Sequence, residues 1–339
     1  MVSKPILIYM PKKVLSYAIV LFVSFTVIFF ILRLIPGNPI RAYVLMLRNR
    51  YGFSPFSEQV IAQFEQAYGL NQDVFTQYVT FLRRFFLEFN LGPSFLAFPT
   101  PVQEVIARYL PWSIVFLSIS TIIAWIVGIS MGVLVGWKQG NRFDALIFNL
   151  SIVGSQIPFY LLALTLVLFF ANAFPIFPSR GGFSPTVTPG FNLEFISSAA
   201  YHAILPSLSL IIVSFLGWLI TTRALTISIL GEDYLLLAQA KGLRKVRILN
   251  RYVLRNVLLP QTTALAMSLG FIINGAFLLE WIFVYPGIGT LFVNSIGLND
   301  FNTIQGVILL TMFTVLTANL IIDLIYPLID PRVAYQGTP

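Results

Sequence analysis

The stretch EDYLLLAQAKGLRKVRILNRYVLRNVLLP, residues Glu232 to Pro260, lies between two long apolar runs. It is basic and contains a glycine, Gly242, near its middle. Asp233 is predicted to cap the start of a short helix, because its carboxylate accepts hydrogen bonds from the first free amides. That helix is predicted to cover Tyr234 to Lys241 and to end at Gly242, since glycine readily adopts the left-handed conformation that closes helices. The first part of the stretch therefore reads as a short, capped helix.

A second helix is predicted from Arg244 to Leu259, and its arginines recur every three or four residues, so that they share one face. These arginines are Arg244, Arg247, Arg251 and Arg255, and the opposing apolar residues are Val246, Leu249, Val253 and Val257. A helix lying on the lipid surface, with arginines reaching phosphates, is the favoured interpretation of this stripe. The first helix is poor in basic residues, which favours docking into a partner protein.

The composition indicates that lipid surrounds most of the chain. Of 339 residues, 57% are hydrophobic and 10% are charged, whereas about a quarter are charged in soluble domains. The absence of cysteine excludes disulfides and thiolate sites, and a single histidine excludes a histidine-based metal cage. The net charge of +8 is interpreted as basic residues on the cytoplasmic side rather than as a nucleic-acid surface.

Six segments are long and apolar enough to cross a membrane as helices, so we predict an all-α polytopic membrane protein. The expected spans are Val14 to Ile35, Trp112 to Val135, Ala145 to Phe174, His202 to Thr222, Thr262 to Val284 and Thr303 to Ile325. With the N-terminus inside, most basic residues of the short connections are cytoplasmic and the two short outer loops hold only Arg180. Both termini are therefore predicted to lie inside.

The predicted organisation has three parts: a tail and first span at 1–35, an extracytoplasmic helical segment at 36–111, and a five-helix core at 112–339 containing the cytoplasmic loop 223–260. Helical periodicity predicts amphipathic outer helices at Glu58 to Tyr68 and at Phe75 to Phe89, the second with Tyr78, Phe81, Leu82 and Phe85 on one side. The outer loop 175–201 is rich in proline and glycine, which indicates turns.

Within the second span, Gly128, Gly132 and Gly136 recur every four residues, a spacing that lets helix backbones approach closely in lipid. The same residues match the G-x-S-x-G pattern of serine nucleophiles. That pattern requires a turn between a strand and a helix, whereas this one lies inside a span. We therefore predict glycines that pack against another helix.

Several motifs, in this order and spacing, resemble importer permeases of the ATP-binding-cassette superfamily, most closely the dipeptide/oligopeptide branch. Besides DYLLLAQAKGLRKVRILNRYVLRN, they are LRLIPGNP at 32–39, YGL at 68–70 with QY at 77–78, IPFY at 157–160, HAILP at 202–206, EWIFVYPGIG at 280–289 and DLIYPLIDPR at 323–332. The loop at 233–256 resembles the EAA loop of these permeases, although Leu236 replaces the glutamate that gives the loop its name. The resemblance covers nearly the whole chain.

The resemblance implies a type I importer permease fold and a transport role without enzymatic activity. The chain has no G-x-x-x-x-G-K-[ST] phosphate loop, so ATP and Mg²⁺ are expected in two separate ATPase subunits, with no cofactor on this chain. A second, related permease and an external substrate-binding protein are the other implied partners, and the cell (plasma or inner) membrane is the implied location. The residues expected to contact an ATPase are Asp233, Tyr234, Ala238, Gln239, Ala240, Lys241, Gly242 and Arg244.

Polar residues within apolar spans are costly and are therefore candidates for a translocation pathway or gate. Glu280, Asn274 and Gln156 are the candidates here. For Glu280 an equal alternative is a hydrogen bond that fixes the turn at Tyr285. For Asp323 we expect a structural pairing with Arg332 or with a neighbouring helix.

The expected cargo is di- or oligopeptides delivered by the external binding protein. The resemblance also implies relatives that carry oligosaccharides or metal chelates, and oligosaccharides are the alternative within the same architecture. The 15% of aromatic residues would suit sugar stacking but does not decide the cargo, because lipid-facing aromatics explain the same content. A secondary transporter or an integral membrane enzyme is the alternative from another class. Inverted repeats, which are typical of secondary transporters, are not evident in the sequence.

Overall fold

The computed structural model describes residues 4–34, 65–66, 71–270 and 276–329. Within these ranges the chain is almost entirely helical, and its only β-type pairing is an isolated antiparallel bridge between Pro93 and Pro101. The expected all-α class is therefore confirmed. Contacts divide the chain into a first unit of Met1–Trp112, Ile273–Phe277 and Gly287–Pro339, and a second unit of Ser113–Ile272 and Leu278–Pro286.

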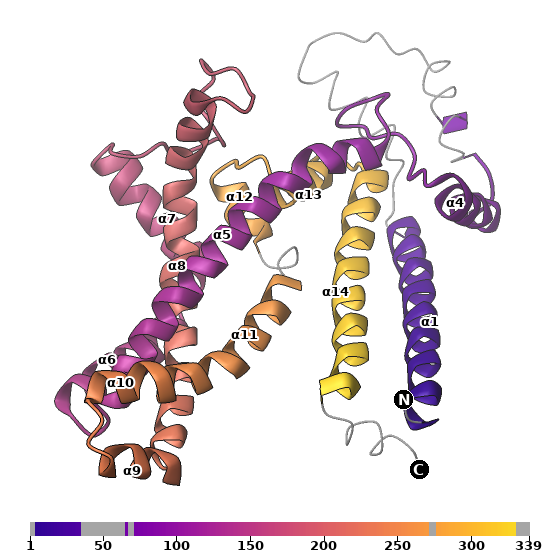
Figure 1. Ribbon diagram of the computed structural model, residues 1–339. Helices are drawn as coiled ribbons and strands as arrows, with labels where there is room; N and C mark the ends of the chain where they lie inside the picture. Colours follow the sequence, from indigo (N-terminus) through magenta and orange to yellow (C-terminus); the bar gives the residue numbers. More distant parts are fainter. Residues whose placement is uncertain (1–3, 35–64, 67–70, 271–275, 330–339) are drawn as a thin grey trace. The chain divides into compact units, whose positions relative to one another are not determined.

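In the first unit, helix α1 (Lys4–Leu34) runs beside the C-terminal helix α14 (Phe301–Ile329), as Figure 1 shows. Tyr17 Oη lies 3.0 Å from Thr317 Oγ1, and Lys13 Nζ lies 2.9 Å from Asp323 Oδ2. The structure thus confirms that Asp323 pairs with a neighbouring helix. The helix α13 (Ile288–Gly297) leads into α14.

Helix α4 (Val74–Glu88) confirms the second predicted amphipathic helix, with its start shifted by one residue. Asp73 caps it, because Asp73 Oδ2 accepts a 2.9 Å hydrogen bond from Thr76 N. The predicted aromatic face packs on α1, where Phe81 stacks on Phe29 and Phe85 meets Phe25 edge-on. The predicted helix at Glu58 to Tyr68 lies almost wholly outside the described residues.

The second unit contains most of α5 (Val102–Trp137), which starts in the first unit, together with the remaining elements that surround the candidate site. These elements are α6 (Arg142–Ser155), α7 (Phe159–Val167), the π-helix η1 (Leu168–Ala173), α8 (Leu193–Leu230), α9 (Asp233–Ala240), α10 (Lys245–Ile248), the π-helix η2 (Leu249–Val253), α11 (Leu254–Gly270) and, for the most part, α12 (Phe277–Ile282). Helix α8 has 38 residues and is therefore about 57 Å long. That length exceeds a hydrocarbon core of about 30 Å, so α8 extends beyond the membrane.

The described residues include four helices long and apolar enough to span a membrane, or five if one bent pair counts as a single span. Two expectations change. The third span is broken by a 91° bend between α6 and α7, because Pro158 disfavours helix at the residue before it. The helix that contains the predicted fourth span is longer than that span, because it runs from Leu193 to Leu230. The predicted fifth span is divided between α11 and α12, with 271–275 outside the described residues, so six spans remain a prediction.

The glycine stripe of α5 packs against α8, as predicted. A Cβ atom added to Gly128 would lie 2.4 Å from Trp218 Cβ, and one added to Gly136 would lie 2.7 Å from Thr226 Cβ. At Gly132 the added atom would lie 2.6 Å from Thr222 Cβ and 2.8 Å from the backbone oxygen of Leu219. The two helices approach this closely only because these positions carry no side chain.

We expect Gly132→Ala to destabilise the protein by about 1–3 kcal/mol, because the added methyl group forces α5 and α8 apart. Gly217→Ala on α8 is the matched control, since a Cβ there meets nothing within 4 Å. The control is expected to be neutral or slightly stabilising, because alanine favours helix. Thermal unfolding of the two purified variants in detergent measures the difference. Equal melting temperatures would contradict close packing at Gly132.

Candidate functional site

The short helix α9 lies between the end of α8 and the start of α10 (Figure 1). The predicted cap is corrected by one residue: Glu232 occupies the N-cap position without a side-chain hydrogen bond, and Asp233 is the first helical residue. A carboxylate in that first turn still interacts favourably with the helix dipole. The position of the cap therefore changes, whereas the existence of a short helix is confirmed.

The end of α9 follows the prediction closely. Gly242 has a φ of +71°, which is the left-handed region. Its N–H donates to Gln239 O at 2.8 Å, and Leu243 N donates to Ala238 O at 3.3 Å. This pair of bonds is the Schellman motif, which satisfies carbonyls that the helix end would leave without partners. The chain therefore reverses sharply at Gly242, as its sequence position predicts.

One side of α9 packs into the protein and the other side is exposed. Leu235 and Ala238 are 1% and 3% exposed, so Ala238 points inward, although we expected it among the residues that contact a partner. Leu236 and Leu237 are 59% and 57% exposed, and sequence reasoning did not include them in the contact set. The remaining predicted contact residues are all exposed: Asp233, Tyr234, Gln239, Ala240, Lys241, Gly242 and Arg244.

The helix after Gly242 differs from the regular helix that we expected. It starts at Lys245, contains the π-helix η2, and continues through α11 to Gly270. The buried residues Ile248, Val253 and Val257 are spaced by five and then four, and the wider π turn keeps all three on one side. Val246, expected on the apolar face, is 68% exposed.

The buried side of α9 belongs to one apolar cluster that joins five further elements, α5, α8, α10, η2 and α11. Leu235 and Ala238 share it with Ile129 and Val133 of α5, with Ile248, Val253 and Val257 beyond the turn, and with partly buried leucines and an isoleucine at the end of α8. Because packed interiors transmit displacement with little compression, a force on α9 acts on α5, α8 and α11 together.

Tyr234 ties α9 to α11. Asn256 Nδ2 donates to Tyr234 Oη at 3.2 Å and to Tyr252 O at 2.7 Å. Desolvation, followed by the nearby charge of Glu232, raises the pKa of the Tyr234 phenol above its ordinary value. The phenol therefore stays neutral at physiological pH and acts as the acceptor.

Two of the three predicted pathway residues, Glu280 and Gln156, lie in the described part of the chain. Glu280 is 1% exposed, and its Oε1 accepts a 2.6 Å hydrogen bond from Ser113 Oγ. Gln156 is exposed and forms the C-cap of α6 at the bend before Pro158. Asn274 lies outside the described residues.

Two buried carboxylates carry contacts that the sequence analysis did not identify. Asp144 of α6 forms a two-point ion pair with Arg223 of α8, at 2.5 Å and 2.8 Å. Asp300, immediately before α14, accepts hydrogen bonds from Ser94 Oγ, Phe95 N and Leu96 N, and from both the hydroxyl and the amide of Thr303. Of these two contacts, only that of Asp300 had a local signal in the sequence. Asp300 lies three residues before Thr303 at a helix start, a spacing that is typical of a cap.

Comparison with known proteins identifies the family. The family described as "Binding-protein-dependent transport system inner membrane component" matches residues 128–335. An oligopeptide transport system permease protein of Bacillus subtilis, AppB, is 32% identical over 307 residues, which cover 91% of this chain and 93% of that protein. OppB of Haemophilus influenzae is 30% identical over 324 residues, covering 96% and 98%. The dipeptide permease DppB of Alkalihalophilus pseudofirmus is 30% identical over 342 residues, covering 97% and 100%.

The family match covers more than half of the chain, and each of these relatives matches nearly all of it. The apolar helices of both units agree with that assignment. The chain therefore belongs to the family of binding-protein-dependent transport system inner membrane components, and it is a multi-pass membrane protein.

Proposed function

We propose that this chain is a permease subunit of an ATP-binding-cassette importer for di- and oligopeptides, and that α9 is its contact with an ATPase subunit. The relatives are named as permeases of peptide transport systems rather than as enzymes, and none of those cited is named for oligosaccharides. Such a permease works with ATPase subunits and with an external binding protein that delivers the peptide. A second permease and two ATPases complete the proposed assembly.

The observation that carries the contact is the division of α9 into two faces. Leu236 and Leu237 are more than half exposed on a helix that lies between the end of α8 and the basic segment, where the charge pattern predicts cytoplasm. Burying two leucines in a partner is favourable by about 1.5–3 kcal/mol each. The inward face, with Leu235 and Ala238, holds the helix to the bundle.

The proposed coupling is mechanical. When nucleotide draws two ATPases together, each carries its docked helix with it, and α9 transfers this displacement to α5, α8 and α11 through the shared apolar cluster. A packed bundle has a small number of discrete arrangements, so a displacement at one end switches it between them. Alternation of inward-open and outward-open arrangements then moves the peptide.

Gln156 is the pathway candidate that we retain. It lies with Ile157 and Pro158 at an exposed break in an apolar span. Helix ends have amides and carbonyls without intrahelical partners, and lipid offers them none. The break is therefore expected to face either a water-filled path or the second permease. For Glu280, the buried bond to Ser113 supports the alternative of fixing the turn.

Uptake in proteoliposomes tests the proposed cargo. The assembled importer with its cognate binding protein is expected to accumulate a labelled dipeptide or short peptide when ATP is supplied to the ATPase side, and not to accumulate maltotriose. Calorimetry of the binding protein with the same two ligands gives an independent measurement, because selectivity resides largely in that protein. Uptake of maltotriose but not of peptide would contradict a peptide importer.

A further inference from the structure

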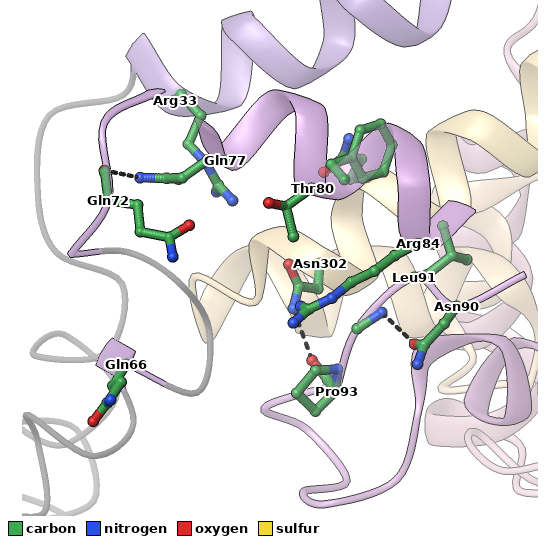
Figure 2. A pocket seen from close by; sticks show the side chains of 13 residues that line it. Arg33, Gln66, Gln72, Gln77, Thr80, Arg84, Asn90, Leu91, Pro93 and Asn302 are labelled. Atoms are coloured by element: carbon green, nitrogen blue, oxygen red, sulfur yellow. Dashed lines mark hydrogen bonds between the residues drawn. The ribbon is translucent and has the colours of Figure 1, made fainter. Parts of the chain in front are cut away.

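A polar cavity lies in the first unit among the end of α1, helix α4, the loop at residues 90–93 and the start of α14 (Figure 2). Its volume is about 130 Å³, whereas a cavity needs only about 10–15 Å³ to hold one water molecule. The cavity therefore accommodates a polyatomic group. It is remote in sequence from α9 and plays no part in the proposed coupling.

The cavity is positively charged. Arg33 from α1 and Arg84 from α4 both line it, and the other lining residues are uncharged, mainly glutamine and asparagine. In the part of the chain that the structure describes, neither guanidinium forms an ion pair with a carboxylate. Arg33 is held over the Phe29 ring, with Cζ at 5.1 Å from the ring centroid. Two guanidinium groups therefore line one cavity, and no described carboxylate pairs with either of them.

Among the described residues, three buried polar atoms of the cavity lining find no hydrogen-bond partner: Arg33 Nε, Gln77 Oε1 and Gln305 Nε2. Gln305 is only 5% exposed, so its amide is removed from bulk solvent. A buried donor or acceptor without a partner is costly. Such groups around a cavity of this size indicate that a polar ligand supplies their hydrogen-bond partners.

The cavity wall is built before any ligand arrives. Asn302 Nδ2 donates to Pro93 O at 3.0 Å, and Asn90 Oδ1 accepts from Gly92 N at 2.8 Å, both drawn as dashed lines in Figure 2. Gly92 has a φ of +87°, and a Cβ there would lie 2.8 Å from Asn302 Nδ2. Immediately beyond this loop, Asp300 fixes residues 94–96 to the start of α14. The lining groups are therefore preorganised.

We propose that this cavity binds a phosphate group. Arginine forks match the oxygens of a phosphate in two-point hydrogen bonds, and a hydrogen phosphate also carries a donor suited to Gln77 Oε1. The group has two chemical sources, a free phosphate ion and the headgroup of an anionic phospholipid. Helix α4 bears on the lipid source, because Phe75 and Leu87 are 70% and 74% exposed on it, as expected of a helix that lies at a lipid surface.

Two probes distinguish the sources on the purified full-length chain in complex with its co-expressed partner subunits. Inorganic phosphate is titrated by calorimetry, and dioleoylphosphatidylglycerol is titrated by native mass spectrometry, with dioleoylglycerol as the lipid that lacks phosphate. We expect one of the two probes to bind. Arg84→Gln is expected to weaken the binding of that probe at least about tenfold, as the loss of a charge-assisted hydrogen bond predicts. Arg84→Lys is expected to retain part of the binding, because it keeps the charge.

Arg83→Gln is the matched control, since Arg83 is the preceding residue of α4, is also exposed, and does not line the cavity. It should bind the probe like the unmodified chain. Arg84 is exposed, so Arg84→Gln is expected to fold, and equal melting temperatures of the two variants check this. Tighter binding of inorganic phosphate assigns the site to the ion, and tighter binding of phosphatidylglycerol assigns it to lipid. Absence of binding by both probes, or equal binding in Arg83→Gln and Arg84→Gln, would overturn the proposal.

Discussion

Replacement of both Leu236 and Leu237 by aspartate is expected to abolish ATP-driven uptake while leaving the chain inserted and folded. Both side chains are more than half exposed, so the substitution removes little internal packing. Loss of two leucines from an interface weakens it by about 3–6 kcal/mol, which is at least about a hundredfold in affinity. Co-purification of the ATPase subunits with the tagged chain measures the loss directly, and peptide uptake in proteoliposomes measures its consequence.

Leu87→Asp is the control for this experiment. It introduces the same charge at a 74% exposed leucine of α4, which the proposed topology places on the opposite side of the membrane. The ATPase subunits are expected to co-purify with Leu87→Asp as with the unmodified chain. If they also co-purify fully with the Leu236/Leu237 double variant, α9 is not the contact, even if the family assignment stands.

Asp300→Ala is expected to cost about 3–5 kcal/mol of stability, which is a large effect for one side chain. The carboxylate is fully buried and accepts five hydrogen bonds, so its removal leaves Ser94, Thr303 and two loop amides without their acceptor. Thermal unfolding in detergent measures the change. The melting temperature of Asp300→Asn should lie between those of the unmodified chain and Asp300→Ala. The amide oxygen of asparagine can replace Oδ2, but its nitrogen then faces the Thr303 amide, which is also a donor.

Asp73→Ala provides the comparison, because Asp73 also caps a helix in the same unit but lies at an exposed position. The loss of stability in Asp73→Ala should be clearly smaller than in Asp300→Ala, since water replaces the carboxylate as acceptor for Thr76. A melting temperature for Asp300→Ala equal to that of Asp73→Ala would show that burial of the hydrogen bonds to Asp300 adds nothing to the stability of the protein. Collapse of the loop at 90–93 in Asp300→Ala should also weaken the binding proposed for the neighbouring cavity.

The sequence predicted those parts of the fold that depend on local periodicity or on residues with special backbone properties. The aromatic face of α4 followed from spacing, although the sequence did not predict that its rings pack on α1. The left-handed turn at Gly242 and the packing of Gly132 against α8 followed from the absence of a side chain at each position. Pairing of Asp323 with a neighbouring helix followed from the cost of a lone charge near lipid.

Local reasoning failed where distant segments decide the outcome. The partners Asp144 and Arg223 are 79 residues apart, and Ser94 and Asp300 are 206 residues apart, so no window of sequence contains either contact. The π turn at Leu249–Val253 also lacked a signal, because it appears only when Ile248 and Val253 must reach the same cluster. The inward position of Ala238 belongs to the same class of error.

By itself, the sequence determined that this is a helical membrane protein with a short capped helix beside a basic segment, because hydrophobic length, charge and glycine act on each residue locally. The tertiary structure alone decided which face of α9 is buried and which leucines are exposed. Leu235, Leu236 and Leu237 are consecutive and chemically identical, so periodicity cannot rank them. Only contact with α5, α8 and α11 distinguishes the leucine that holds the helix from the two that remain available to a partner.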